Sequence, residues 1–237
     1  MNKYIFDLGF HNGDDSDYYL KKGFIVVAVE GNPNLVELGR KRFEKEILDK
    51  KLYLYHRVIS NITGEIPFFI HPTKTDWSSC NIQKVIWVGS TARETNVDTI
   101  NLKYLYTTYE IPYYIKTDVE GNDIDVVKQL FFNKERPKFV SFELSKIDYY
   151  EIFSYLHVAG YSLFQLVNQA NNRGKVDKTI GYGFSEYSSG LFGEWLPDSK
   201  WLTINETLTN YMKYKELKVI DNQELALGWI DIHAQFI

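Results

Sequence analysis

The stretch from Tyr4 to Glu30 constrains the fold more than any other part of the chain. A short apolar run leads into a loop that contains Gly9 and Gly13, a helix-like segment follows, and a second apolar run at residues 24–29 ends at Glu30. Glycine lets a loop turn sharply and approach a ligand closely, and an acid at the end of the second strand of such a unit accepts hydrogen bonds from ribose hydroxyls. The pattern therefore predicts a strand-helix-strand unit that binds a nucleoside cofactor.

The spacing of the glycines bears on which nucleoside binds. A dinucleotide fingerprint reads Gly-x-Gly-x-x-Gly, so that a pyrophosphate can rest on the helix N-terminus, whereas this loop has only Gly9 and Gly13. The helix that follows begins with Asp14, Asp15 and Asp17, which would repel a pyrophosphate. The same acids would attract the positive sulfonium and amino groups of S-adenosylmethionine. The loop therefore favours S-adenosylmethionine over a nicotinamide cofactor.

Composition sets the outer limits. A chain of 237 residues that is 44% hydrophobic and 24% charged is typical of one α/β domain, here residues 1–237. The net charge of −4 and the lack of a basic run argue against nucleic acid as a partner. No apolar run approaches the roughly 20 residues of a membrane span, and an early first strand leaves no space for a cleavable signal, so we expect a cytoplasmic protein. Cys80 is the only cysteine and is expected to be a small apolar filler.

Strand-like and helix-like segments alternate along the chain. Apolar runs predict strands, and amphipathic segments bounded by acids, Asn-Pro or glycine predict helices. The predicted strands are 4–6, 24–29, 52–58, 66–69, 113–116, 138–142, 161–167 and 229–234, with a turn at 61–64 that makes a hairpin, and the predicted helices are 14–22, 33–43, 124–131 and 148–159. This order predicts an α/β fold that is Rossmann-like and doubly wound, with a mostly parallel sheet, helices on both faces and a late antiparallel edge strand.

Acids follow several of these strands. Ligands of such sheets bind at the carboxyl ends of the strands, so we expect Glu30, Asp118, Glu120 and Glu143 to border one cleft. Two alternatives stay open. Asp118 and Glu120 could cap the next helix, although Asn122 and Asp123 are better placed to do so, and Glu143 could pair with Lys116 or Lys146.

Three motifs stand at these strand ends: Asp7-Leu8-Gly9 with Gly13, Glu30-Gly31-Asn32-Pro33, and Lys116-Thr117-Asp118-Val119-Glu120-Gly121. Together they resemble the FkbM family of S-adenosylmethionine-dependent methyltransferases, over about residues 4–167. The resemblance implies the class I methyltransferase type of fold and methylation of hydroxyl groups, often on sugars or polyketide-type products. Phe10 and His11 depart from the family, which usually has a small residue and an asparagine there.

The resemblance also implies roles for individual residues. Glu30 would hold the ribose, Ser16 would reach the cofactor carboxylate, and Ser60 would lie near the adenine. The remaining cofactor residues implied are Asp7, Gly9, His11, Gly13 and Asn32. For catalysis, Asp118 would act as general base or hold a Mg²⁺ or Mn²⁺ ion that acidifies the acceptor alcohol, with Glu120 and Glu143 as further ligands or assisting groups. Lys116 and His11 complete the set of catalytic candidates.

Three histidines are further candidates. His11 is either a base or ligand near the transferred methyl group or a loop histidine bonded to the backbone. His233 would share a strand face with Asp231, most simply as an ordinary edge-strand pair, and His71 would stand where the hairpin enters an irregular stretch that approaches the acceptor.

Two long irregular segments, 72–96 and 168–200, are expected to bind the acceptor, because loops of this length are usually functional. The first contains Lys74, Trp77, Ser78, Ser79, Trp87 and Arg93, and the second contains Tyr182, Phe184, Tyr187 and Trp195. Tryptophan beside hydroxyls and a cation suits a sugar ring, which favours a glycan or small-molecule acceptor. The alternative is that these aromatic residues cover the open end of the sheet or form the interface of a homo-oligomer.

The sequence alone therefore leaves three candidate functions. The leading one is an S-adenosylmethionine-dependent O-methyltransferase that acts on a hydroxyl of a sugar or glycan. A non-catalytic binding module with a methyltransferase-like fold is the alternative, and a nicotinamide-dependent Rossmann oxidoreductase is disfavoured by the missing third glycine and the acidic loop.

Overall fold

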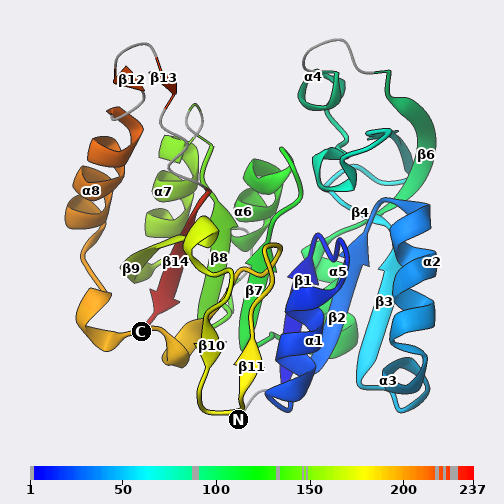
Figure 1. The fold of residues 1–237 in the computed structure, drawn as a ribbon, viewed down its shortest axis with the longest axis horizontal. Helices are drawn as coiled ribbons and strands as arrows, with labels where there is room; N and C mark the ends of the chain where they lie inside the picture. The colour runs from blue at the N-terminus through cyan, green and yellow to red at the C-terminus, as the bar shows by residue number, and fades with distance from the viewer. Residues whose placement is uncertain are drawn as a thin grey trace.

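The computed structural model describes residues 3–86, 91–131, 134–145, 147, 149–216, 219–220, 223–224 and 229–237. Within these residues a seven-stranded sheet forms the centre of the molecule, in the order β3-β2-β1-β7-β8-β14-β9 (Figure 1). The strands are β1 (Tyr4–Leu8), β2 (Ile25–Glu30), β3 (Leu52–His56), β7 (Tyr114–Thr117), β8 (Phe139–Glu143), β9 (Tyr161–Asn168) and β14 (Ile230–Phe236).

The last strand runs against all the others. β14 pairs antiparallel with β8 and with β9, while β3, β2, β1, β7 and β8 pair in parallel. The predicted fold class, a mostly parallel Rossmann-like sheet with a late antiparallel strand, is confirmed. β14 itself lies one strand in from the edge, and β9 is the edge strand. Asp231 and His233 share a face of β14 as predicted, and both are 2% exposed, as an inner strand covered on both faces requires.

Helices cover both faces of the sheet, as predicted (Figure 1). Alternate strand residues such as Ile5 and Phe6 belong to opposite cores, because successive side chains of a strand point to opposite faces. The core around Ile5 includes residues of α1 (Asp14–Lys21), and α2 (Pro33–Arg42) and α3 (Glu44–Leu48) follow β2. The core around Phe6 includes residues of four helices: α5 (Leu102–Tyr109), α6 (Asp123–Phe131), α7 (Tyr149–Val158) and α8 (Ile204–Glu216). Residue 148, the predicted start of α7, lies outside the described residues.

The predicted hairpin is wrong, because its two strands do not pair with each other. The first strand ends at His56, and the next residues form β4 (Val58–Ile59), which pairs in parallel with β6 (Arg93–Ile100). β5 (Glu65–Ile70) pairs antiparallel with the other side of β6. β6 has no strand signal in the sequence, since most of its residues are polar and only Val97 and Ile100 are buried. The resulting three-stranded sheet stands beyond the carboxyl end of β2 (Figure 1).

The segment 168–200 is attached to α1 by hydrogen bonds. The backbone N–H and hydroxyl of Ser189 donate to the Asp15 carboxylate at 2.8 and 2.7 Å, and the Ser185 hydroxyl donates to Asp14 at 2.6 Å. A buried ion pair of 2.9 Å joins Lys22 to Asp177. Asp14 and Asp15, two of the acids expected to attract the cofactor, therefore also hold this segment. The short elements here are η2 (Gln169–Asn171), β10 (Val176–Asp177), β11 (Tyr182–Gly183), η3 (Gly193–Trp195) and η4 (Asp198–Lys200).

The first irregular segment contains η1 (Thr75–Trp77) and α4 (Ile82–Val85), and β12 (Val219–Ile220) and β13 (Gln223–Glu224) form a short hairpin; α4, β12 and β13 lie near the top of Figure 1. None of the helices in the described part of the chain combines the length and the apolar character needed to cross a bilayer.

Candidate functional site

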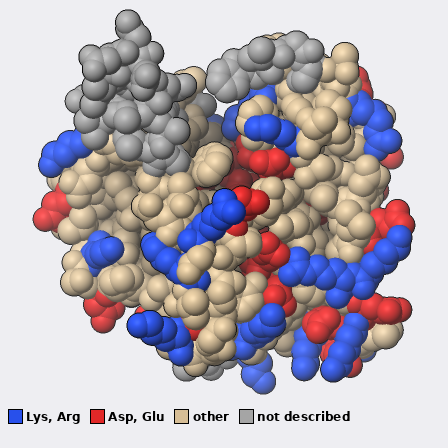
Figure 2. All heavy atoms as spheres, viewed as in Figure 1, with Lys and Arg blue, Asp and Glu red and all other residues tan. Residues whose placement is uncertain are grey.

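A cavity of about 480 Å³ opens at the carboxyl ends of the parallel strands, where the sequence predicted the cleft. This volume lies in the range of about 300–1,000 Å³ that is typical of small-molecule sites. Its walls come from the loop after β1, the ends of β2, β7 and β8, the three-stranded sheet and both irregular segments. Figure 2 shows acidic side chains in the hollow at the upper centre of this face.

Gly9 lies where the loop after β1 meets the loop after β7. Its φ angle is +91°, and a Cβ atom at this position would overlap the backbone carbonyl of Asp118. The Gly9 carbonyl accepts a hydrogen bond of 2.8 Å from the Lys116 ammonium. Only glycine meets both requirements, a left-handed backbone and this close approach. The sharp turn expected at Gly9 is present, whereas its close approach to a ligand stays a prediction.

Glu30 ends β2 and presents its carboxylate to the cavity. The backbone N–H groups of His11 and Asn32 donate to its two oxygens at 2.8 and 2.7 Å, which fixes the carboxylate in one orientation. Each oxygen keeps a lone pair for a further donor. Burial raises the pKa of Glu30 to about 7, and the two N–H donors act in the opposite direction. The group can therefore accept hydrogen bonds from a diol, as the ribose role requires.

His11 connects the glycine loop to both irregular segments. Its Nε2 atom lies 3.2 Å from the Thr75 hydroxyl, and its ring centroid lies 5.2 Å from that of Tyr187. Its φ angle of 49° is left-handed, which asparagine tolerates better than most residues. Burial lowers the pKa of His11, so the ring is neutral at physiological pH. Its contacts are those of a residue that positions loops around the cavity.

An apolar slot lies beside Glu30. Val58, Ile59 and Phe68 line the cavity there, and the Phe68 ring packs so closely over Gly31 that a Cβ atom on that glycine would lie 2.6 Å from it. These residues escaped the sequence analysis because only the pairing of β4 and β5 with β6 brings them to the cavity. Ser60, the predicted adenine neighbour, is buried and accepts a hydrogen bond from the Ile62 N–H instead of lining the cavity.

The structure places several predicted cofactor residues behind the cavity wall. Ser16 donates to the Asp7 carboxylate at 2.6 Å, and both side chains are fully buried. Asn32 caps α2 through its side chain, which accepts from the Asn34 N–H at 3.1 Å. Gly13 has a φ angle of +83° and lies against the Phe10 ring. In the described structure these residues shape the loops that form the wall.

Lys116 is the electrostatic centre of the site. Its ammonium lies 3.6 Å from Asp7, 3.8 Å from Asp15 and 3.7 Å from Asp118, and the side chain is only 5% exposed. These carboxylates raise the pKa of Lys116 against the opposing effect of burial, with Asp118 the largest contributor. The amine stays protonated at neutral pH. It can therefore orient carboxylates and carbonyls but cannot act as a base.

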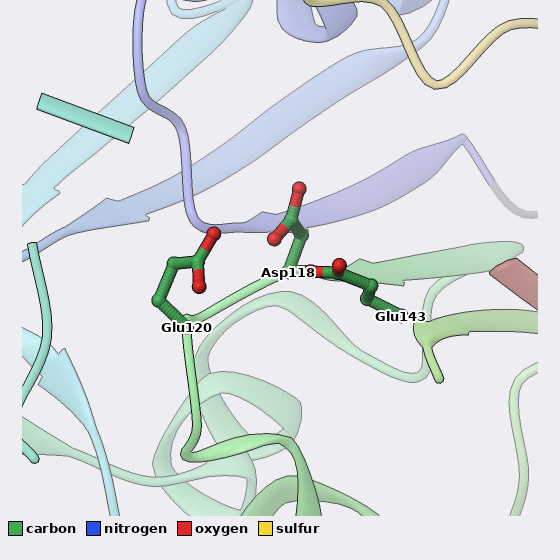
Figure 3. Close-up of side chains that lie close together, drawn as sticks. All are labelled: Asp118, Glu120 and Glu143. Carbon is green, nitrogen blue, oxygen red and sulfur yellow. The ribbon is translucent and has the colours of Figure 1, made fainter. Parts of the chain in front are cut away.

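Asp118, Glu120 and Glu143 lie together, as predicted. One carboxylate oxygen from each can be chosen so that all lie within 4.8 Å of one another. In Figure 3 Asp118 stands between the other two, and the Glu143 carboxylate points toward it. Burial, followed by the Asp118 charge, raises the pKa of Glu120 to about 8 and raises that of Glu143 well above its ordinary value. Oxygen ligands in this arrangement suit Mg²⁺ or Mn²⁺, and the metal site stays a prediction.

The alternative role of helix capping falls to Asp123. Its carboxylate accepts from the Gly121 N–H at 3.1 Å and from the Val119 N–H at 3.5 Å, at the start of α6. Among the described residues, no ion pair joins Glu143 to Lys116. The other proposed partner, Lys146, lies outside the described residues, so that alternative stays a prediction.

A buried acid behind this cluster was missed as a site residue. Asp231 pairs in register with Glu143 across β14 and β8, and its Oδ1 atom accepts a hydrogen bond of 2.6 Å from the Gln169 amide. Burial raises the pKa of Asp231 well above its ordinary value, and the Asp118 charge adds to the effect. Because Gln169 lines the cavity, Asp231 positions part of its wall. The signal available in the sequence was an acid between the apolar residues Ile230 and Ile232 of a predicted strand.

Both irregular segments contribute side chains to the cavity. Lys74 and Trp77 come from the first segment, with the Lys74 ammonium 4.0 Å from the centre of the Trp77 ring, and Tyr187 comes from the second. The other aromatic residues named for the second segment, Tyr182, Phe184 and Trp195, instead join the core beside α1. His71 accepts the Lys74 N–H at 2.9 Å and shapes a turn. Trp87 lies outside the described residues.

Solved structures that align with the chain include several methyltransferases. The precorrin-6y C5,15-methyltransferase of Geobacter metallireducens is 9% identical, with 100% of this chain and 80% of that chain covered and a TM-score of 0.42. An O-methyltransferase of Bacillus cereus, in complex with S-adenosylhomocysteine (SAH), is 9% identical, with 99% and 74% covered and a TM-score of 0.42. The methyltransferase FkbM of Methylobacillus flagellatus is 13% identical, with 70% of this chain covered and a TM-score of 0.43, and the alignment spans 40% of its own length. No curated protein matches the chain.

Residues 7–163 match the protein family described as the Methyltransferase FkbM domain. This range contains the glycine loop, Glu30, Lys116 and the acids that follow β7 and β8. It agrees with the resemblance carried by the motifs at these positions. The chain therefore belongs to the FkbM family of methyltransferases.

Proposed function

We propose that this protein is an S-adenosylmethionine-dependent O-methyltransferase whose acceptor is a hydroxyl group of a sugar or glycan. The observation that carries the proposal is the pairing, within one cavity, of the fixed Glu30 carboxylate with the acid cluster of Asp118, Glu120 and Glu143. Membership of a methyltransferase family supports the reaction type. The aromatic side chains of the irregular segments support a saccharide acceptor.

The residues present fit the cofactor. Glu30 would accept hydrogen bonds from both ribose hydroxyls, and the slot formed by Val58, Ile59 and Phe68 offers apolar walls to the adenine. Asp15 lines the cavity beyond Gly9, and its negative charge would favour the positive methionine end. When bound, S-adenosylmethionine supplies an activated methyl group, whose bond to sulfur breaks with the electron pair left on sulfur.

We assign Asp118 as the group that accepts the proton of the acceptor alcohol. An alcohol must lose its proton as its oxygen bonds to the methyl carbon, and a carboxylate placed at the end of β7 can accept that proton. The Lys116 ammonium lies 3.7 Å from the Asp118 carboxylate and helps to hold it in place. Glu120 and Glu143, whose pKa values are raised, are better suited to orient the acceptor hydroxyls. Holding the oxygen in line with the methyl group supplies much of the rate.

Transfer of a radiolabelled methyl group to a pool of saccharides tests the proposal. We expect transfer by the wild-type protein and a loss of at least about a hundredfold in Asp118→Asn, since general base catalysis contributes about 10²–10⁴-fold. Binding of SAH should be unchanged in the same variant. The binding-module alternative predicts SAH or saccharide binding without any transfer, and the oxidoreductase alternative predicts binding of NAD in place of SAH.

A further inference from the structure

The part of the cavity that remains for the acceptor is lined by several carboxyl groups, which a cation bound there would hold in the ionised form. Glu120, Glu143 and Asp76 line it in addition to Asp118. Glu120 has a lysine, Lys84, at 4.0 Å. In the described part of the chain no lysine or arginine lies within ion-pair distance of Glu143, although its carboxylate lies deep at the end of β8.

The cations that line the cavity are already engaged. Arg57 lies 3.4 Å from Asp98, and Arg173 lies 3.2 Å from Glu186. Lys74 lies over the Trp77 ring, and the single charge of Lys116 is shared by three carboxylates. Among the described residues that line the cavity, an acceptor with a phosphate or carboxylate would therefore meet several acids and find only Lys74 without an acidic partner.

Aromatic faces stand beside the same acids. Trp229 immediately precedes β14, next to the end of β8, where the Leu144 N–H donates to the Ile230 carbonyl at 2.9 Å. Its side chain is 57% exposed and that of Tyr187 is 50% exposed, although both line the cavity. Exposed aromatic faces beside carboxylates attract organic cations as well as sugar rings. A divalent metal ion would use the acids but would gain nothing from the aromatic side chains.

We propose that the acceptor is a saccharide with a free amino group, whose ammonium lies against Glu143 and Glu120 while its ring stacks on the exposed aromatic residues. This inference rests on the proposed function, because it names the acceptor class of the same site. The ammonium ion takes no part in the transfer: the acceptor hydroxyl oxygen forms the new bond to the methyl carbon, and its proton goes to Asp118. The amine instead anchors the sugar so that one hydroxyl faces the methyl group.

Calorimetry tests the inference with the protein saturated by SAH. The probes are methyl glycosides of glucosamine, galactosamine and mannosamine, each compared with its N-acetyl counterpart, which has the same ring but no positive charge. We expect at least one free amine to bind about tenfold more tightly than its N-acetyl form, which corresponds to about 1.4 kcal/mol, because the N-acetyl form lacks the charged contact. The difference should shrink as salt is added.

The variant Glu143→Gln separates charge from shape, since it removes the charge and keeps the size of the side chain. We expect it to bind amine and N-acetyl forms equally while its affinity for SAH is unchanged. Glu37→Gln, on the exposed face of α2, is the matched control and should keep the amine preference. Equal binding of the paired probes by the wild type, or no binding of any probe while SAH binds, would overturn the inference and leave the methyltransferase assignment intact. If the wild type bound Mg²⁺ or Mn²⁺ and Glu143→Gln did not, the inference would also be overturned, because the acids would then be ligands of a metal ion. Failure of SAH itself to bind would instead contradict the proposed function.

Discussion

Replacement of Lys116 by methionine should destabilise the protein strongly. The substitution keeps most of the side-chain volume but leaves the carboxylates of Asp7, Asp15 and Asp118 without the ammonium that lies 3.6, 3.8 and 3.7 Å from them. Asp7 and Asp15 are 0% and 5% exposed, so water cannot replace the lost charge. Removal of one partner from a buried ion pair costs about 3–5 kcal/mol, which in a domain of this size lowers the melting temperature by roughly 6–20 °C.

The loss of stability in Lys116→Met should depend on pH, and the pKa values of the carboxylates determine whether it grows or shrinks as pH rises. Burial already raises the pKa of Asp15 to about 6 from its ordinary 3.8, so the folded protein binds a proton more tightly than the unfolded chain and loses stability as pH rises from about 4 to about 6. Without Lys116 the pKa of Asp15 should rise further, which extends that loss to higher pH. The difference in unfolding free energy between wild type and Lys116→Met should therefore be larger at pH 8 than at pH 5.

Urea unfolding at these two pH values measures the difference. Lys41→Met is the matched control, because Lys41 pairs with Glu37 on the surface, where both side chains are well exposed, and it should leave the unfolding curve unchanged. A Lys116→Met protein as stable as the wild type, or one whose deficit does not change with pH, would refute the view that Lys116 neutralises buried acids.

Three further predictions follow from the site. Gly9→Ala should abolish SAH binding or folding, because its Cβ atom would overlap the Asp118 carbonyl and its φ of +91° is strained for alanine; an active, stable variant, measured by calorimetry and thermal unfolding, would contradict this. SAH should bind more weakly below pH 7, by up to about tenfold per pH unit, since Glu30 has a pKa of about 7 in the free protein and must be ionised to hold the ribose best. The affinity for SAH should depend less on pH in Glu30→Gln. The same pH dependence in both proteins would show that a group other than Glu30 causes it. Methyl transfer in the presence of a chelator tests the metal prediction: loss of activity with rescue by Mg²⁺ or Mn²⁺ would support it, whereas full activity, which the amine-bearing acceptor predicts, would remove it.

The first unit of the fold could be predicted because its signals are local. Strand, glycine turn, helix and strand follow one another between Tyr4 and Glu30, and neighbouring strands along the chain are also neighbours in the sheet. The rule that ligands bind at the carboxyl ends of parallel strands then brought Glu30, Asp118 and Glu143 to one cavity, although they are far apart in sequence.

The parts that could not be predicted depend on distant pairing. β6 has few apolar residues and becomes a strand because β4 and β5 bind its two sides, so the apolar slot beside Glu30 has no local signature. The alternation of β14 suggested a half-exposed edge, whereas pairing with both neighbours buries its polar residues Asp231 and His233. The acids of α1 were interpreted from charge alone, since nothing near them in sequence reveals that Ser185 and Ser189 bind them.

Titration calorimetry of SAH into the wild type, Glu30→Ala and Asp118→Asn tests the central claim most directly. The account predicts binding by the wild type, similar binding by Asp118→Asn, and at least about tenfold weaker binding by Glu30→Ala, because the ribose loses charge-assisted hydrogen bonds of about 1.5–3 kcal/mol each. Thermal unfolding of each variant provides the control for folding. Absence of binding by the wild type, or equal binding by a folded Glu30→Ala protein, would contradict the account.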